Sequence, residues 1–303
     1  MSGSNEVLDR MTPRLQTNWD VRAATNFICG GMGSGLLAAI VLMSLPGNGR
    51  RLLAVLALAL IGAGLTAVWL EIGKPMRALN VYRNAATSWM TREAIIALFV
   101  FAFGAAAVLF DWPGAFWLAG FFGSGFLYAQ ARILYANKGI PAWRHPGVIG
   151  VIVTTDLAEG AGLLSISTLY WSELVPFSVL FVGIVSLVCL RFFAWRGYLA
   201  GLRRAGSPSG TLKAFDEIND PFIWLGHVAP VVIGVVAALF GSHWLLALAG
   251  VLAVATGAWF KYVLVCRAAF TQGLALVRTP SHGASTPGSG GKPGWTEARN
   301  LRG

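Results

Sequence analysis

The stretch EIGKPMRALNVYRNAATSWMTRE, residues 71–93, separates two long apolar runs at 52–71 and 93–111. It begins and ends with a glutamate, and four basic residues, Tyr82 and Trp89 lie between them. Runs of about 20 apolar residues span a bilayer as helices, so this polar segment connects two such helices at a membrane surface. It is either an ordinary cytoplasmic loop or part of a functional site, and the rest of the chain helps to choose.

The composition is that of a polytopic membrane protein. Of the 303 residues, 56% are hydrophobic and only 12% are charged, whereas a soluble domain has about 25% charged residues. The 12 tryptophans are typical of a protein with an aromatic belt at each membrane surface. The net charge of +10 therefore indicates basic loops on one membrane face. It does not indicate nucleic-acid binding, for which the chain has no motif.

The apolar runs define the fold class. A membrane-spanning helix needs about 20 apolar residues, and we expect an all-α, polytopic integral membrane protein with eight transmembrane helices packed as helical bundles. Most of the polar breaks are short, which indicates antiparallel neighbouring helices. The predicted spans are roughly 24–45, 52–71, 93–111, 115–135, 148–170, 174–195, 221–241 and 244–266.

Lysine and arginine predict the orientation, because they are enriched in cytoplasmic loops. With eight spans, 20 of the 23 basic residues lie on one side, and only Arg50 and Arg51 lie on the other, with Lys261 inside the last span. Both termini and the 71–93 stretch are therefore predicted to be cytoplasmic. We expect an N-terminal cytoplasmic segment over 1–23 without a signal peptide, a membrane domain over 24–270 and a disordered, Gly/Ser/Pro-rich cytoplasmic tail over 271–303.

Two carboxylates fall inside the fifth predicted span, where ionisable groups are costly and indicate function. Asp156 and Glu159 are three residues apart and therefore share one helix face. They are candidates for a proton path. Alternatively, they form a polar helix contact that a basic residue elsewhere satisfies, or the coupling site of an ion-coupled small-solute transporter.

Metal chemistry within this chain is not expected. Of the four histidines, only His227 lies at a plausible depth in a span, whereas a b-type haem with two histidine ligands needs a facing pair. The three cysteines have no CxxC spacing and are expected to be small buried hydrophobes. No hydrolytic or phosphate-binding motif is present.

Polar and aromatic side chains gather at one predicted depth, near the cytoplasmic ends of the first four spans. A quinone head group needs hydrogen-bond partners for two oxygens, a proton donor or acceptor and an aromatic or apolar wall. The alternative is an interfacial belt of Trp, Tyr and Arg. The set comprises Trp19, Arg22, Asn26, Glu71, Trp89, Glu93, Arg132 and Tyr135.

Two segments carry a family resemblance. In the first, Glu71 is followed by Gly73, Pro75 and Arg77, and Glu93 lies 22 positions after Glu71. The second is WDVRAATNFICGGMGSGLL at 19–37. Both resemble the haem-free membrane anchors of molybdenum oxidoreductases, the NrfD-like family of DMSO reductase and polysulfide reductase anchors. The family pattern is His-Leu-Gly-x-Pro-x-Arg with an acidic residue 22 positions after the histidine, so a glutamate replaces the histidine here. Within the family, the segments look most like the anchor of phenylacetyl-CoA:acceptor oxidoreductase.

The resemblance implies a quinone-binding membrane anchor in the bacterial cytoplasmic (inner) membrane, acting in anaerobic respiration. It would be a subunit of an oxidoreductase complex rather than a catalyst on its own. An iron–sulfur electron-transfer subunit and a molybdopterin catalytic subunit would dock on the cytoplasmic side. Electrons would pass between the partner's last cluster and ubiquinone or menaquinone, with proton exchange and no haem in this subunit.

Roles for individual residues follow from this resemblance. Glu71 and Glu93 are expected to handle protons, and Asp156 and Glu159 to form a deeper proton path. The remaining alternatives are the transporter and a purely structural anchor without quinone. The residues expected to shape the head-group pocket are Arg22, Asn26, Trp89, Arg92 and Tyr135.

Overall fold

The computed structural model describes residues 12–43, 47–71, 86–173 and 175–273. Within these ranges the chain is helical, and the only extended pairing is an antiparallel bridge between Leu15 and Phe270. The predicted all-α class is therefore confirmed. The segment 72–85, which contains most of the GxPxR region, and the tail from 274 lie outside the described residues.

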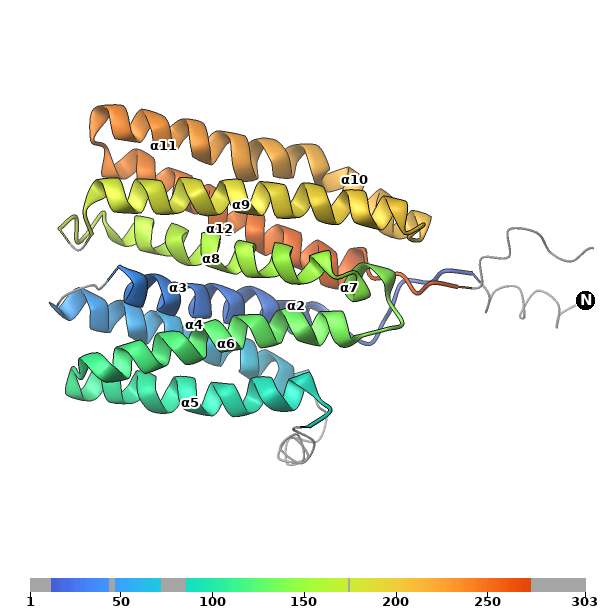
Figure 1. The fold of residues 1–303 in the computed structure, drawn as a ribbon, viewed down its shortest axis with the longest axis horizontal. Coiled ribbons are helices and arrows are strands. Elements are labelled where there is room, and N and C mark those ends of the chain that lie inside the picture. The colour runs from blue at the N-terminus through green and yellow to red at the C-terminus, as the bar shows by residue number, and fades with distance from the viewer. Residues whose placement is uncertain (1–11, 44–46, 72–85, 174, 274–303) are drawn as a thin grey trace, which may run out of the picture. The chain divides into compact units, whose positions relative to one another are not determined.

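Each of the eight predicted spans coincides with a helix or with helices joined end to end (Figure 1). The short helix α7 (Pro141–Arg144) lies between the fourth and fifth. The first segment consists of α2 (Val21–Thr25), the π-helical turn η1 (Asn26–Gly30) and α3 (Gly31–Leu42). It is followed by α4 (Gly47–Glu71), α5 (Trp89–Phe110), α6 (Pro113–Ala136), α8 (Gly147–Ser167) and α9 (Phe177–Arg204). The last two segments are α10 (Ser209–Ile223), η3 (Trp224–Val228) and α11 (Ala229–Phe240), then α12 (His243–Tyr262) and η4 (Val263–Arg267).

Seven of these segments are long and apolar enough to cross a membrane, so the chain is an integral membrane protein. The exception among the predicted eight is α6, although it has 24 residues. Its sequence contains glycines and the polar Gln130 and Arg132, which lower its mean hydropathy. The count of eight spans therefore remains a prediction.

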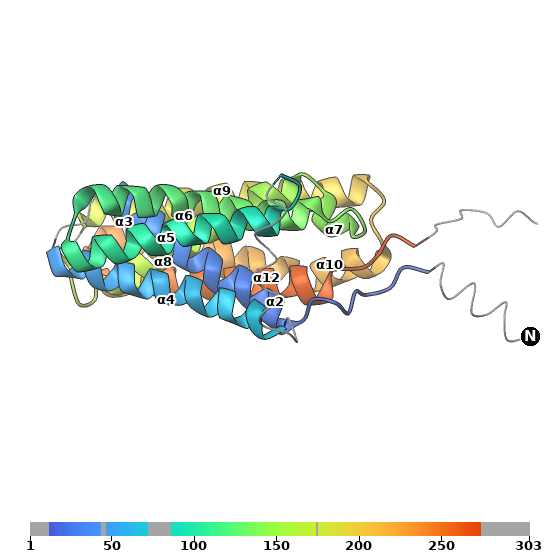
Figure 2. The same ribbon diagram turned by 90° about the horizontal axis from the view of Figure 1, so that it is seen from below.

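The helices run side by side along the long axis of the view (Figures 1 and 2). Those from α2 to α6 form one group and those from α8 to α12 form another, and α3 contacts α8 between the groups. Glycines permit this contact, because a Cβ on Gly160 would overlap the backbone of Gly35. Small residues at such crossings let helices approach closely within a bilayer.

The two ends of the helical bundle differ in charge. The end at which α2 and α5 begin and α9 ends, called here the basic end, carries Arg22, Arg92, Arg132, Arg144, Arg203, Arg204 and Arg267. At the opposite end, Arg50 and Arg51 of α4 pair with Asp111, at 2.6 and 3.0 Å. These ion pairs hold the pKa of Asp111 below its ordinary value, through hydrogen bonds from Arg51 and then Arg50. They join the start of α4 to the end of α5.

One predicted polar break is largely helical. The sequence predicts a loop over 196–220, but α9 continues to Arg204 and α10 begins at Ser209. The amphipathic helix α10 buries Phe215 and Ile218 while it exposes Asp216 and Glu217. Hydropathy alone misses these helical extensions, because they are amphipathic and lie outside the apolar run.

Candidate functional site

A buried polar cluster lies one helical turn inside the basic end. The carboxylate of Glu93 accepts a hydrogen bond from Asn26 Nδ2 at 3.2 Å, and Gln130 Nε2 donates to the carbonyl oxygen of Asn26 at 3.0 Å. The three side chains come from α5, η1 and α6, and each is at most 5% exposed. Glu93, Asn26 and Gln130 are called here the Glu93 cluster.

Local sequence places these three side chains. Ser88 caps the start of α5 by accepting a hydrogen bond from the Thr91 amide, so Glu93 falls in the first turns of the helix. Gly64 of α4 leaves room for Asn26, because a Cβ there would lie 3.1 Å from the Asn26 Cα. The sequence analysis predicted Glu93 and Asn26 but missed Gln130. The sequence does mark Gln130, because it is a polar amide side chain within the predicted span 115–135, and polar residues in spans indicate function.

Two oxygens of the cluster are buried without a hydrogen-bond partner among the described residues. They are Asn26 Oδ1 and Gln130 Oε1. An unpaired buried polar atom costs about 1–3 kcal/mol, so such atoms indicate a bound water or ligand. Together with Glu93 they offer acceptors for hydroxyl donors, and the amide nitrogens offer donors. This donor and acceptor set fits both oxidation states of a quinone head group.

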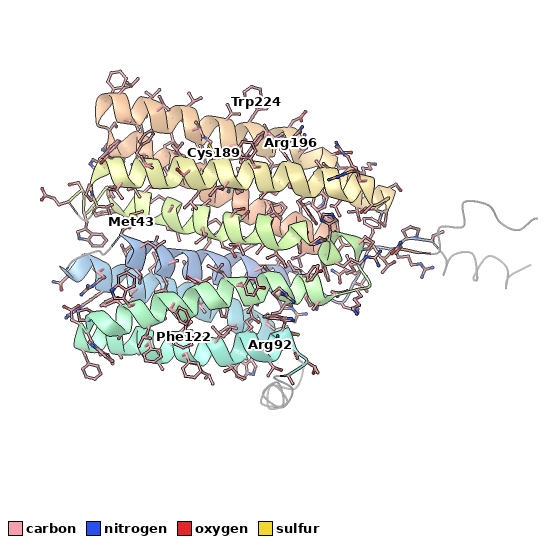
Figure 3. All side chains as sticks on the ribbon, viewed as in Figure 1. Met43, Arg92, Phe122, Cys189, Arg196 and Trp224 are labelled. Atoms are coloured by element: carbon pink, nitrogen blue, oxygen red, sulfur yellow. The ribbon has the colours of Figure 1, made fainter. Side chains whose placement is uncertain are left out.

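Three of the predicted pocket residues are linked by aromatic and cationic contacts next to the Glu93 cluster. Arg92 lies over the Trp89 ring at 4.4 Å, and Arg132 lies over the same ring at 4.5 Å. Arg132 also lies 5.4 Å from the Tyr135 ring centre and hydrogen-bonds the Tyr128 hydroxyl at 2.9 Å. Figure 3 shows Arg92 toward the basic end of α5. The resulting wall brings α5 and α6 together above Glu93.

Arg22 stands apart from this wall. Arg22 is about half exposed and pairs with Asp20 at 2.8 Å, and its Nη1 donates to the Leu70 carbonyl at 3.4 Å. It therefore fastens α2 to the last turn of α4. Glu71 is the last residue of α4, but its side chain lies outside the described residues. Whether Glu71 and Glu93 act together stays a prediction.

A second polar cluster lies deeper in the bundle. Lys261 Nζ of α12 contacts Asp156 Oδ1 at 3.0 Å and Glu159 Oε2 at 2.5 Å, and donates to the Ile28 carbonyl at 3.3 Å. The three charged side chains are completely buried. Asp156 and Glu159 share one face of α8, as their spacing predicted. Lys261, left without a role in the sequence analysis, supplies their counter-ion; Lys261, Asp156 and Glu159 are called here the Lys261 cluster.

The charges of the Lys261 cluster do not balance. One ammonium group serves two carboxylates, and Asp156 Oδ2 and Glu159 Oε1 have no hydrogen-bond partner within the described ranges. If both acids are ionised, one negative charge has no cation in direct contact, and only the more remote buried guanidinium of Arg191 acts on Glu159 to offset it. A proton shared within the cluster removes that charge. The geometry therefore suits a group of residues that gains and loses a proton.

The π-helical turn η1 connects the two clusters. Its first residue, Asn26, provides the carbonyl that Gln130 contacts, and Ile28 provides the carbonyl that Lys261 contacts. A π-helical turn widens the helix by one residue and is frequent at functional sites. No periodicity in the sequence predicts this turn. It brings residues from α5, α6 and α12 to one segment of the first helix.

Arg191 requires a correction. The predicted topology counts it among the 20 basic residues on the cytoplasmic side, but it is completely buried within α9. Its guanidinium donates to the carbonyl oxygens of Ala253, at 2.9 Å, and of Gly226 in η3. Backbone acceptors thus hold this charge inside the bundle, which a count of loop charges cannot detect. His227, the histidine predicted at span depth, lies in η3 with Nδ1 2.8 Å from the Phe222 carbonyl.

These features define a class: a polytopic helical membrane protein with a carboxylate–amide site near one end and a buried ion cluster below it. A comparison with protein families then identifies the group. Residues 29–191, more than half of the chain, match the family described as DMSO reductase anchor subunit (DmsC). The chain belongs to this family, which confirms the resemblance inferred from the sequence.

The matched region does not contain the whole of either cluster. Glu93, Gln130, Asp156 and Glu159 lie within it, whereas Asn26 and Lys261 lie outside. No curated protein matches the chain significantly. Family membership does not favour the transporter alternative for Asp156 and Glu159.

Proposed function

We propose that this protein is the membrane anchor and quinone-binding subunit of a molybdenum/iron–sulfur oxidoreductase complex. The observation that carries the proposal is the Glu93 cluster, a buried carboxylate beside two unpaired amide oxygens. It is supported by membership in a family of anchor subunits. Electrons pass between a partner's iron–sulfur cluster and ubiquinone or menaquinone, and this chain binds the quinone and handles its protons.

The cluster residues have distinct roles in this proposal. When bound, the quinone supplies the two-electron, two-proton chemistry. Asn26 and Gln130 orient the head group, because each amide offers a donor and an acceptor. Glu93 exchanges one proton with the nearer ring oxygen, and Glu71 exchanges protons with the membrane surface. Trp89, Arg92 and Tyr135 form the wall of the pocket, and Arg22 holds the end of α4 in place.

Asp156 and Glu159 form a deeper proton path. Their place next to Lys261 supports this role, because one ammonium group contacts two buried carboxylates. The turn η1 gives the path a physical connection to the Glu93 cluster, through Asn26 on one side and Ile28 on the other.

The proposal includes the topology and the partners. All eight helical segments cross the bacterial inner membrane as one domain over 24–270, and both the 1–23 segment and the 271–303 tail are cytoplasmic. The basic end then faces the cytoplasm, where its arginines attract an acidic surface of the iron–sulfur subunit. The molybdopterin subunit lies beyond that partner.

Purification from native membranes tests the proposal. The affinity-tagged full chain is expected to retain a cysteine-rich iron–sulfur protein and a molybdopterin protein, identified by mass spectrometry. A solvent extract of the same preparation is expected to contain quinone. Isolation without an iron–sulfur partner would support a transporter, and a complete complex without quinone would support a purely structural anchor.

A further inference from the structure

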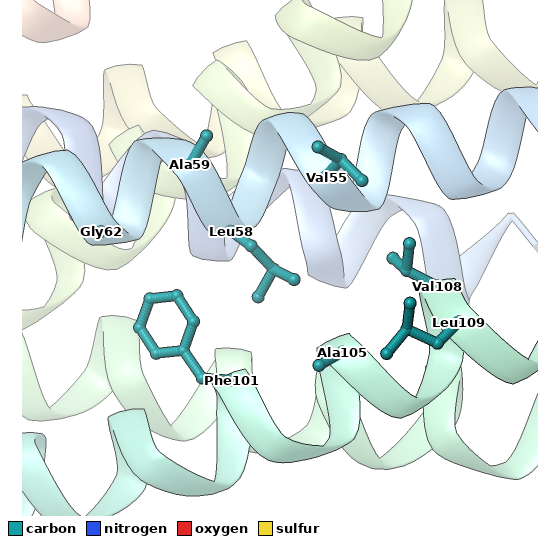
Figure 4. A pocket seen from close by; sticks show the side chains of 8 residues that line it. All are labelled: Val55, Leu58, Ala59, Gly62, Phe101, Ala105, Val108 and Leu109. Atoms are coloured by element: carbon teal, nitrogen blue, oxygen red, sulfur yellow. The ribbon is translucent and has the colours of Figure 1, made fainter.

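An apolar groove runs along the outside of the bundle between α4 and α5 (Figure 4). Its walls are Val55 to Gly62 on α4 and Phe101 to Leu109 on α5, and its volume is about 530 Å³. None of the eight lining side chains is polar. Volumes of about 300–1,000 Å³ are typical of ligand sites. Because Val55 and Leu109 are strongly exposed, the groove opens toward lipid.

Small residues create the groove and a large one closes its floor. At Gly62 a Cβ would meet only the Phe101 ring, at 3.7 Å, so the space beside this glycine is open. Leu58 fills the floor by packing against Gly104. Figure 4 shows the Phe101 ring and the Leu58 side chain between the two helices. The chain thus leaves a channel where larger side chains would let the two helices pack together.

Both walls of the groove lead to the Glu93 cluster. On α5, Phe101 lies eight residues after Glu93, which is about 12 Å along the helix axis. On α4, Gly62 lies two residues before Gly64, the residue that packs against Asn26. Gly62 faces the groove whereas Gly64 faces Asn26, about 200° further round α4, so a molecule whose polar end lies beside Asn26 and Glu93 passes between α4 and α5 to bring its apolar end to the groove.

We propose that the groove between α4 and α5 binds the isoprenoid tail of the quinone whose head group lies at the Glu93 cluster. This inference rests on the proposed function. The branched tail fits a groove lined only by aliphatic and aromatic groups. The tail gains affinity there because a groove that matches its shape makes closer van der Waals contacts with it than lipid chains do. The groove also directs the head group to enter between α4 and α5.

Variants that fill the groove test the proposal. Gly62→Leu and Ala105→Phe place larger side chains in the groove. Both substituted residues are apolar and are compatible with a membrane helix. Gly150→Leu is the control, because Gly150 is an exposed glycine on α8 with open space around its Cα. The full chains are placed in phosphatidylcholine nanodiscs, and quinone binding is followed by quenching of tryptophan emission.

Two quinones that have the same ring but different tails distinguish binding of the tail from binding of the head group. For a quinone with a long isoprenoid tail, the groove variants are expected to raise the dissociation constant about tenfold, which corresponds to about 1.4 kcal/mol of lost packing. For the analogue with a methyl group in place of the tail, all variants are expected to bind as the wild type does.

Other outcomes overturn the inference in distinguishable ways. If the wild type binds both quinones and the groove variants bind both unchanged, the groove does not hold the tail. If the groove variants instead alter only the phospholipid retained after detergent extraction, the groove is a lipid site. If the wild type binds neither quinone, the proposed function itself is wrong.

Discussion

At the scale of single residues, Glu93 decides whether the site performs proton chemistry. It is buried, and its carboxylate accepts a hydrogen bond from Asn26 beside the unpaired amide oxygens of Asn26 and Gln130. A general acid or base in this position accelerates a reaction by a factor of about 10²–10⁴. The residue has no nearby cation among the described contacts that would fix its charge, so its protonation state responds to what binds beside it.

Replacing Glu93 by Gln should therefore lower quinone-linked turnover of the purified complex about 100-fold or more. The amide preserves the size and polarity of the side chain, so the dissociation constant for quinone should change little. Glu217→Gln is the control, because Glu217 is exposed on α10 and pairs only with Arg267. Turnover of Glu93→Gln at the wild-type rate would remove the proton role.

Lys261 is the residue on which the deeper cluster depends. Lys261→Met should destabilise the protein by about 3–5 kcal/mol, because it leaves two buried carboxylates without a counter-ion. The unfolding temperature in detergent measures this loss. Lys213→Met, at an exposed position on α10, should have no comparable effect.

A further variant distinguishes the effect of the cluster's charges on stability from the effect of its side-chain packing. The triple substitution Lys261→Met, Asp156→Asn and Glu159→Gln removes all three charges and should recover most of the lost stability, but not turnover. If the single and triple variants unfold at the same temperature, then the ion cluster does not determine stability in the way its contacts suggest.

At the scale of elements, the crossing of α3 and α8 holds the two helix groups together. Gly160→Leu should prevent normal assembly, because a side chain there overlaps the backbone of Gly35, and overpacking typically costs about 1–3 kcal/mol. Gly150→Leu on the same helix faces open space and should assemble normally. Size-exclusion profiles in mild detergent compare the two variants, and a monodisperse Gly160→Leu protein would show that the crossing can relax.

The ion pairs of Asp111 join α4 and α5 at the end opposite the basic end, and their contribution should depend on pH. The folded-state pKa of Asp111 is lowered by Arg51 and Arg50, so the stabilisation is complete above the unfolded pKa and is lost as the pH falls through the folded one. The wild type should therefore unfold at a higher temperature than Asp111→Asn at pH 7. The difference should shrink as the pH falls below about 3.9, the ordinary pKa of an aspartate. A difference that is constant with pH would show that the carboxylate charge is not involved.

The elements also show how far sequence can predict this protein. Apolar run length located the eight long helical segments of the described chain but missed most of α10 and the end of α9, and the spacing of Asp156 and Glu159 correctly predicted their shared face. Their partner Lys261 is 105 and 102 residues away from them, a pairing that only helix packing reveals. The same holds for Gln130 beside Asn26 and for the backbone acceptors of Arg191. The hydropathy of the turn η1 does not differ from that of its flanking helices, so the apolar run that predicts the first span does not reveal it.

At the scale of the whole molecule, the number of spans determines which face meets the partner subunits. This topology can be measured with single-cysteine variants, made in a chain whose three native cysteines are replaced by alanine. The cysteine is placed at Lys138, Ser172 or Ala205. With eight spans, an impermeant thiol reagent should label Ser172→Cys in right-side-out vesicles. It should label Lys138→Cys and Ala205→Cys only after lysis. Labelling of Lys138→Cys before lysis would mean that α6 does not cross the membrane.

The Lys261 cluster has a consequence for how the protein is made. Membrane helices leave the ribosome in order, so Asp156 and Glu159 reach the bilayer before Lys261, which follows Glu159 by 102 residues. Until α12 arrives, the two acids must stay protonated or remain shielded by the insertion machinery. A chain that stops before Lys261 carries an unneutralised pair of acids in lipid. Insertion of α12 therefore gives this pair of acids its contacting cation.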